Sequence, residues 1–459
     1  MRSRGRLGLA FLTVVVVVAA GIALDRVGPE PRSEPAHAVA SSGAWLCPHG
    51  GGQEWQTDLY VANPGETASE IRVTPLAAKR GGQAQTFTVA PGSEIVVPAA
   101  SSDPASSSFV EYFGGWVAVG WVTHAGGSAS GVAAEPCAPE PGTRWLAADG
   151  STEQGQEADL VVMNPFDVDA VIDVAVFSQS RAPIRDSALT DVRIAPHRSA
   201  ILRLNEVSAD EPAAAAEIVA RTGRVAVSSL GISRDGGIRS VLAVRSPSSE
   251  VLLPGTQDVG QSTLAVMVPR EQEVRFGAVL LSGGKPDAAG GITDATVSGP
   301  SARAYPIITK GPSLVDIRAA AGSTIVAVRR SEGQSADPGA TGGTAEPATA
   351  WVILPTVAGE PNTPGMVLGN PGSTPLEVSL TLLGASGQID RIAVTVAATS
   401  AVDVPVAFLE QDPTAAVVAV SADGAFVAAG ASSSLGQEGV AGYAVAMGVV
   451  VPSDVPMGP

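Results

Sequence analysis

The sequence repeats one unit four times, and this repetition constrains the fold more than any other feature. Each copy contains an apolar segment that ends in a turn with proline, and these prolines are 101, 104 and 102 residues apart. The turn residues are Asn63, Pro64, Asn164, Pro165, Pro269, Asn370 and Pro371. A fixed period of this kind indicates duplication of one structural unit. The chain is therefore expected to contain four related units.

The residues that follow each turn predict β-strands. In residues 376–382, leucine or valine occupies every second position and polar residues lie between them. This period of two is typical of a strand with one face on a core and the other in water. Further apolar segments, separated by turns rich in Gly, Pro and Ser, bring the total to about seven or eight strands per copy. We therefore predict an all-β fold of four tandem antiparallel β-sandwiches of immunoglobulin-like type.

A β-propeller or a continuous β-prism arrangement is the alternative fold. A propeller blade takes about 40–50 residues, so each copy would have to supply two blades. In either case the four repeats are expected at residues 43–140, 141–247, 248–345 and 346–459. The third repeat diverges, because it has Val268 where the others have asparagine and a Gly-rich insertion near residues 283–299. Its last segment, 331–350, predicts a mobile loop or linker.

The amino end predicts a membrane anchor. Three arginines precede an apolar run over residues 7–24, and eighteen residues of helix measure about 27 Å, enough to cross a bilayer. Residues 1–6 then form a cytosolic tail, 25–42 a Pro- and Ser-rich stalk, and 25–459 lie outside the cytoplasm. The predicted location is thus the cell membrane, crossed once. The alternative is a cleaved signal peptide and a secreted protein, although Ala36-His37-Ala38 lies far from the apolar run for a cleavage site.

The two cysteines, Cys47 and Cys137, lie near the two ends of the first repeat. An even number of cysteines in an exported chain predicts a disulfide bond. No histidine or second cysteine cluster accompanies either residue, so we do not expect a metal site or a nucleophile there.

No motif in the sequence predicts catalysis. None of the four histidines forms a ligand-spaced pair, and the chain has no nucleophile elbow, phosphate-binding loop or dinucleotide fingerprint. We expect no catalytic, cofactor-binding or metal-binding residue, no cofactor and no enzyme activity. The formal net charge of −17 argues against a nucleic-acid partner, because phosphate binding needs clustered Lys and Arg.

Aromatic residues are concentrated in the first repeat and leave two interpretations open. Trp116 and Trp121 are five residues apart, so on a regular strand they face opposite sides and one of them would be exposed. Exposed aromatics on a β-sheet are a platform for sugar rings or for a protein partner. The other interpretation places these side chains in the core beside the disulfide. The possible binding residues are Trp55, Tyr112, Trp116 and Trp121.

The repeat also resembles a known family. The best match is the Trp-led segment at residues 145–152, followed by the strand that ends in Asn164-Pro165. This combination is similar to an actinobacterial, membrane-anchored secreted family of unknown function that is built from such repeats. The resemblance covers about residues 43–455 and implies a cell-envelope location. It supplies no catalytic residue that could be transferred.

These observations predict a non-catalytic, membrane-anchored extracytoplasmic repeat protein with a structural or interaction role at the cell envelope. Its expected partners are the membrane, through the N-terminal helix, and an envelope protein or glycan. One alternative is an array of modules that bind cell-wall glycan or polysaccharide. A second alternative is an accessory subunit of an envelope enzyme.

Overall fold

The computed structural model describes residues 42–79, 81–234, 236–255, 259–283, 286–332, 338–357, 362–435 and 441–457. The predicted cytosolic tail and anchor, and all but the last residue of the predicted stalk, lie outside these residues. Within the described part of the chain, no helix combines the length and hydrophobicity needed to cross a bilayer. Residues 42–459 form one compact unit, and the description below concerns this unit alone.

The first repeat forms two four-stranded antiparallel sheets, with strand orders β1-β6-β3-β4 and β5-β2-β7-β8. Its elements are β1 (Ser42–Cys47), β2 (Gln56–Asn63), β3 (Ser69–Leu76), β4 (Gln85–Val89), β5 (Ser93–Ala99), β6 (Ser107–Phe113), β7 (Ala118–Ala125), the short 3-10 helix η1 (Gly127–Ala129) and β8 (Gly131–Pro136).

The second repeat has the same topology, with orders β9-β14-β11-β12 and β13-β10-β15-β16. Its elements are β9 (Arg144–Ala147), β10 (Gln156–Asn164), β11 (Ala170–Ser178), η2 (Ser187–Leu189), β12 (Val192–Ile194), β13 (Arg198–Arg203), η3 (Leu204–Glu206), β14 (Ala214–Thr222), β15 (Ala226–Ser233) and β16 (Ile238–Leu242).

The third repeat keeps this topology, although two short strands replace the outermost one. Its sheets have the orders β17-β23-β19-β20, with β21 also paired to β19, and β22-β18-β24-β25. Its elements are β17 (Glu250–Gly255), β18 (Val259–Val268), β19 (Glu273–Leu281), β20 (Asp287–Ala288), η4 (Ala289–Gly291), β21 (Ala295–Ser298), β22 (Ser301–Lys310), β23 (Ser313–Ala319), β24 (Val326–Glu332) and β25 (Pro338–Thr341). The segment 331–350, expected to be a loop, therefore supplies an edge strand, β25.

The fourth repeat adds one strand to its first sheet. Its sheets have the orders β29-β28-β31-β26-β34 and β30-β27-β32-β33. Its elements are β26 (Ala350–Ile353), β27 (Asn362–Asn370), β28 (Leu376–Gly384), β29 (Gly387–Val396), β30 (Ser400–Asp403), the single-turn helix α2 (Val406–Leu409), β31 (Ala416–Val420), β32 (Val427–Leu435), β33 (Ala441–Met447) and β34 (Val449–Val450).

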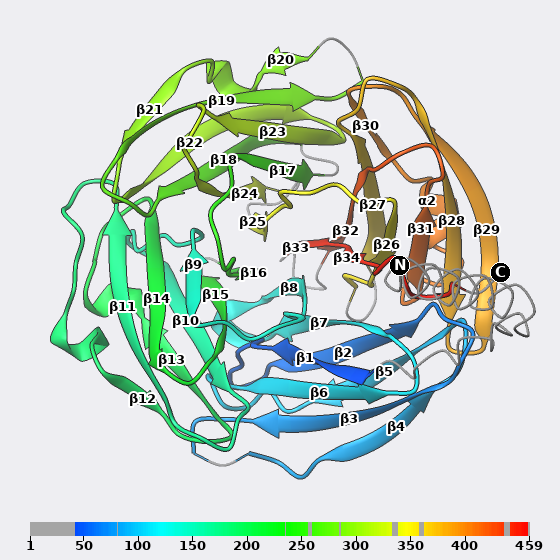
Figure 1. Ribbon diagram of the computed structural model, residues 1–459, viewed down its shortest axis with the longest axis horizontal. Helices are drawn as coiled ribbons and strands as arrows, with labels where there is room; N and C mark the ends of the chain where they lie inside the picture. The colour runs from blue at the N-terminus through cyan, green and yellow to red at the C-terminus, as the bar shows by residue number, and fades with distance from the viewer. Residues whose placement is uncertain are drawn as a thin grey trace, which may run out of the picture. The chain divides into compact units, whose positions relative to one another are not determined.

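The sheets pack on both faces, between repeats as well as within them. Phe177 of the second repeat shares an apolar cluster with Met267 of the third, and Leu314 of the third shares one with Val427 of the fourth. The first and second repeats meet in the same way, around Leu46 and Met163. Apolar residues of the first and fourth repeats also form one cluster, which contains Val119 and Val418. The sheets of residues 42–459 therefore follow one another around a closed ring (Figure 1).

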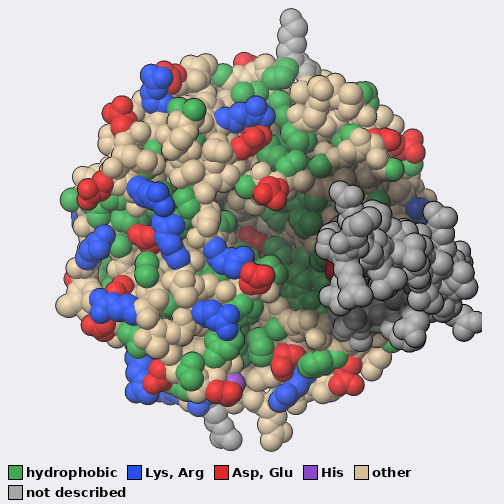
Figure 2. Space-filling model, in the orientation of Figure 1, with side chains coloured by type: hydrophobic (Ala, Val, Ile, Leu, Met, Phe, Trp, Pro, Cys, Tyr) green, Lys and Arg blue, Asp and Glu red, His purple; other side chains and the backbone are tan. Residues whose placement is uncertain are grey.

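The face of the ring that is seen in this orientation carries charged side chains of both signs. Lys or Arg side chains and Asp or Glu side chains are interspersed over the described residues of this face (Figure 2). The surface is hollowed near the middle of the ring, and hydrophobic side chains lie in the hollow.

This arrangement corrects part of the predicted fold. The fold is all-β and each repeat forms a facing pair of antiparallel sheets. The pairs, however, are not separate sandwiches, and their strand order differs from the immunoglobulin order, in which strands A, B, E and D share a sheet. The ring corresponds to the propeller-like alternative, in which each copy supplies two sheets. The physical reason is found in β10, where Leu160, Val161, Val162 and Met163 are all buried, so both faces of the sheet need a partner.

Candidate functional site

The asparagines of the repeat turns are buried structural residues. The Asn63 side-chain amide donates hydrogen bonds to the backbone oxygens of Thr67 (2.8 Å) and Val89 (3.2 Å), and its oxygen accepts one from the Gly65 amide (3.0 Å). Asn164 and Asn370 make the same set of contacts in their own repeats. These side chains therefore fix the turn to the next strands and cannot bind a ligand with the same atoms.

The Trp-led segments have an equally repetitive role. The indole N–H of Trp45 donates to the Val117 oxygen (2.8 Å), that of Trp145 to the Val225 oxygen (2.8 Å), and that of Trp351 to the Phe426 oxygen (2.9 Å). Each bond links the first strand of a repeat to the residue that precedes its seventh strand. Because the three indoles are buried, these bonds satisfy their only polar group.

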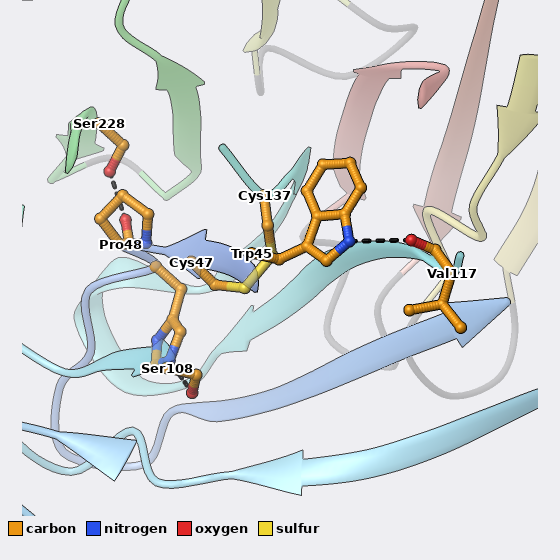
Figure 3. The surroundings of a disulfide bond; sticks show 8 residues. Trp45, Cys47, Pro48, Ser108, Val117, Cys137 and Ser228 are labelled. Atoms are coloured by element: carbon orange, nitrogen blue, oxygen red, sulfur yellow. Dashed lines mark hydrogen bonds between the residues drawn. A yellow bond between two sulfur atoms is a disulfide. The ribbon is translucent and has the colours of Figure 1, made fainter. Parts of the chain in front are cut away.

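The predicted disulfide between Cys47 and Cys137 is confirmed (Figure 3). It joins the end of β1 to the residue that follows β8, and these strands belong to different sheets of the first repeat. His49 lies close to it in the sequence and contacts the Gly50 oxygen (2.7 Å) and the Ser108 hydroxyl (3.1 Å) with its two ring nitrogens. Burial lowers the pKa of His49 to about 4, so this ring is neutral and structural at ordinary pH.

The structure corrects the interpretation of the first-repeat aromatics as a binding platform. Trp55, Trp116 and Trp121 are only 9%, 7% and 1% exposed, and Tyr112 is half-buried. Trp116 packs edge-to-face against Trp45, with ring centroids 6.1 Å apart. Trp116 lies before β7, so the alternation of that strand does not apply to it, and the rings of Trp116 and Trp121 both belong to the same apolar cluster as Trp45. The three tryptophans therefore belong to the core, as in the alternative interpretation, and Tyr112 packs at the edge of that core.

The junction between the first and fourth repeats closes the ring and involves several buried polar groups. The Tyr60 hydroxyl donates to the Val357 oxygen (3.0 Å), and Gly65 forms an isolated β-bridge with Met457 near the carboxyl end. Glu94 of β5 is buried against the fourth repeat and accepts a hydrogen bond from the Ala416 amide. Burial, with a smaller contribution from Asp412, raises the pKa of Glu94 well above its usual value.

A pocket of about 760 Å³ opens at this junction, and we call it the junction pocket. This volume lies within the range of known ligand sites, about 300–1,000 Å³. The pocket is lined by residues of the first repeat, the fourth repeat and the carboxyl end. The lining residues are Pro64, Gly65, Glu66, Pro91, Gly92, Glu377, Ser379, Thr381, Leu383, Gly387, Gln388, Arg391, Val418, Val420, Ala422, Asp423 and Met457.

The alternation of β28 explains why a pocket forms here. Leu376, Val378 and Leu380 occupy one face of the strand and fill the core of the fourth repeat. The intervening residues Ser379 and Thr381 face the first repeat and line the pocket. Short polar side chains leave space at this junction that larger apolar ones would fill. The sequence shows this polar face but not that it opposes another repeat.

The junction pocket combines an apolar surface with charged groups. Leu383, Val418, Val420 and Met457 contribute the apolar part. The charged lining residues are three acids, Glu66, Glu377 and Asp423, and one base, Arg391.

Two of these charged residues are held in place. The Arg391 guanidinium donates to the Ser379 hydroxyl (3.0 Å), and the Asp423 carboxylate accepts from the Glu377 amide (2.9 Å). Of the residues predicted to be functional, only Pro64 is among the described lining residues of this pocket.

A second polar cluster holds the second and third repeats together. The buried Asp149 carboxylate accepts from Arg239 (3.0 Å) and from Arg330, and Arg330 also donates to the Gly150 oxygen (2.6 Å). Burial alone would raise the pKa of Asp149, but Arg330 and Arg239 hold it below its usual value. Because Asp149 and Arg239 belong to the second repeat and Arg330 to the third, these ion pairs join adjacent repeats.

The described residues contain no group of three or more His, Cys, Asp or Glu placed to hold a metal ion.

Comparison with known proteins identifies the family. The sequence pattern of a family of unknown function, DUF5719, matches residues 112–359, more than half of the chain. The chain belongs to this family. The matched residues include the whole of the second and third repeats. This match agrees with the prediction from the sequence that the chain belongs to a family of unknown function.

Other comparisons are less informative. No curated protein matches the chain. A solved tetra-tandem repeat from the extending region of a large adhesion protein is 10% identical, with 90% of this chain and 100% of that chain covered and a TM-score of 0.11. Trypsin-activated alpha-2-macroglobulin from Escherichia coli is 8% identical, with 90% and 42% covered and a TM-score of 0.12. Neither likeness is close enough to carry an argument about fold or function.

Proposed function

We propose that this member of the DUF5719 family is a non-catalytic, membrane-anchored protein of the extracytoplasmic space that binds an envelope protein through its junction pocket. The observation that carries the proposal is the pocket of about 760 Å³ between the first and fourth repeats. Residues 7–24 would hold the protein in the membrane, and residues 42–459 would present the pocket to the partner.

The lining of the junction pocket favours a polypeptide segment as the occupant. Leu383, Val418 and Val420 offer an apolar surface for side chains, while Ser379 and Thr381 offer hydroxyl groups for a backbone. The described lining residues include no Phe, Tyr or Trp. Sugar rings usually stack on such aromatic faces, so a glycan ligand, the main alternative, is less well supported.

The test is a pull-down with the full chain in detergent, offered a membrane-protein extract in one arm and purified peptidoglycan or envelope polysaccharide in the others. Thr381→Arg places a long cationic side chain into the junction pocket. Thr86→Arg makes the same change at an exposed position of β4 outside the pocket lining. We expect one membrane protein to be retained by the wild type and by Thr86→Arg, and to be lost with Thr381→Arg.

Other results would change the proposal. Retention of a polysaccharide that Thr381→Arg abolishes would support the glycan alternative instead. Equal retention by all three proteins would contradict a role for the junction pocket.

The anchor requires a separate measurement. Cells that express the full chain are fractionated, and the membrane fraction is washed at alkaline pH. An uncleaved anchor predicts a full-length protein that stays in the membrane. A shorter protein in the medium would show that the cleaved-signal alternative is correct.

A further inference from the structure

The second repeat contains a separate pocket of about 410 Å³ around Asp159, which we call the Asp159 pocket. Its walls come from the segment before β10, from β10 itself, from the end of β13 with η3, and from Arg234, which follows β15. The lining residues are Thr152, Glu153, Gln154, Gly155, Gln156, Glu157, Asp159, Arg203, Asn205, Glu206 and Arg234. None of these residues belongs to the junction pocket.

Asp159 is an unusual residue for its position. It lies in β10, directly opposite Arg203 and Leu230 of the neighbouring strands, and it is only 4% exposed. The adjacent residues Ala158 and Leu160 point into the core of the second repeat. Val161, on the same face of the strand as Asp159, packs against the first repeat. Asp159 therefore lies on the face that packs against the first repeat, between the charged residue Glu157 and the apolar residue Val161.

The Asp159 carboxyl group is not fully satisfied by the protein. Its Oδ1 atom is buried and has no hydrogen-bond partner among the described residues. A buried carboxylate oxygen without a donor costs free energy, so such atoms are rare in folded proteins unless a ligand or water completes them. Oδ1 itself has almost no accessible surface, but Asp159 lines the pocket, so a molecule in the pocket can contact its carboxyl group.

The charges around Asp159 indicate the kind of donor. The lining contains four carboxyl groups, Asp159, Glu153, Glu157 and Glu206, and two guanidinium groups, Arg203 and Arg234. Arg234 approaches Glu157 only loosely, at 3.9 Å. The pocket thus has an excess of negative charge and favours a cation that can donate hydrogen bonds.

An organic cation fits this pocket better than a metal ion. A metal ion needs several oxygen, nitrogen or sulfur ligands at short distance, and the described residues contain no suitable group of three acids, histidines or cysteines. A primary ammonium group needs only one carboxylate at hydrogen-bond distance, with further acids nearby. We propose that the Asp159 pocket binds the primary ammonium group of a small organic molecule, which donates a hydrogen bond to the carboxylate of Asp159.

The test is isothermal titration calorimetry with the detergent-solubilised full chain at pH 8. The probe is 1,4-diaminobutane, and the matched control ligand is 1,4-butanediol, which has the same length but no charge. Asp159→Asn keeps the size of the side chain and removes its charge. Asp167→Asn makes the same change at an exposed residue of the second repeat outside the pocket.

We expect the wild type and Asp167→Asn to bind 1,4-diaminobutane, and Asp159→Asn to bind it at least tenfold more weakly. Binding of 1,4-butanediol should be undetectable. Equal binding of the diamine by the wild type and Asp159→Asn would overturn the proposal, as would equal binding of both ligands or no binding of the diamine.

A measurement on the wild type avoids dependence on the folding of a variant. The ¹³C resonance of the Asp159 carboxyl carbon is followed through a pH titration, with and without 1,4-diaminobutane. A bound ammonium group favours the ionised carboxylate, so the titration should move to lower pH when the diamine is present. An unchanged titration would overturn the proposal. Because this pocket and the junction pocket share no residue, either proposal can fail without the other.

Discussion

The Tyr60 hydroxyl donates a 3.0 Å hydrogen bond to the Val357 oxygen, which lies 297 residues later in the chain. This bond connects the second strand of the first repeat to the segment after the first strand of the fourth. Burial, with smaller contributions from Asp58, Glu94 and Asp412, raises the pKa of Tyr60, so its proton stays available for donation. The ring is therefore closed by specific polar contacts as well as by apolar packing.

Tyr60→Phe is expected to weaken ring closure without removing the packing of the aromatic ring. The Val357 oxygen loses its donor, and a lost buried hydrogen bond of this kind costs about 1–3 kcal/mol. Denaturant unfolding measures this cost. Tyr305→Phe, at a half-buried tyrosine of the third repeat, serves as the control and should change the free energy of unfolding by less than about 0.5 kcal/mol. Equal effects of the two substitutions would contradict a closing role for Tyr60.

Asn370→Ala is expected to destabilise the protein although it removes only a turn residue. The Asn370 side-chain amide donates hydrogen bonds to the backbone oxygens of Thr374, Val396 and Ala397. All three oxygens would lose this donor. We predict a loss of about 1–3 kcal/mol in the free energy of unfolding. Gln154→Ala, at an exposed amide, should have almost no effect. A loss below about 0.5 kcal/mol for Asn370→Ala would show that the turn signature is not structural.

Removal of the disulfide should be the most costly change in the first repeat. Cys47 and Cys137 are separated by 90 residues, and the chain-entropy model gives about 4.6 kcal/mol for a loop of that length. Replacing both cysteines with alanine should lower the denaturation midpoint accordingly. The reducing agent dithiothreitol should then have no further effect on the variant. A variant as stable as the wild type would contradict this prediction.

Asp159 should make stability fall as the pH rises. Burial, opposed by Arg203 and assisted by Glu157 and Glu206, raises the pKa of Asp159 from 3.8 to about 7. The folded state therefore holds this proton more tightly than the unfolded state. The stabilisation is complete below pH 3.8 and is lost as the pH passes through about 7, a change of about 4 kcal/mol at most.

The Asp159→Asn variant has no titrating group at this position, so comparison with the wild type isolates the contribution of Asp159 to the pH dependence of stability. Its free energy of unfolding, relative to the wild type, should increase by several kcal/mol between about pH 4 and pH 8. Denaturant unfolding of both proteins at several pH values measures the difference. A difference that stays constant over this range would contradict a raised pKa for Asp159.

Local features of the fold could be predicted from the sequence, whereas ring closure could not. The alternation at residues 376–382 and the apolar strands that end in Asn-Pro correctly indicate strands, because side-chain period depends only on neighbouring residues. The disulfide was predicted from an even number of cysteines in a chain that is expected to be exported. The unbroken apolar run Leu160–Met163 is typical of a sheet that is buried on both faces, but the prediction of separate sandwiches did not use this signal, and the local pattern does not show which repeat is the partner.

The two pockets could not be predicted for the same reason. Thr381 faces residues of the first repeat that lie about 300 positions earlier, and its polarity alone suggested a surface in water. Asp159 meets Arg203 only through the pairing of β10 with β13. The prediction that Trp116 and Trp121 face opposite sides failed because it placed both on one regular strand, whereas β7 begins only at Ala118.

The most direct test of the central claim is site-specific photo-crosslinking in intact cells. A photoreactive amino acid replaces Gln388, an exposed lining residue of the junction pocket, or Thr86, an exposed residue outside the lining. We predict that one envelope protein is crosslinked from position 388 and not from position 86, and that Thr381→Arg abolishes this crosslink. No crosslink at position 388, or the same crosslinked protein from both positions, would contradict the claim that the junction pocket is the binding site.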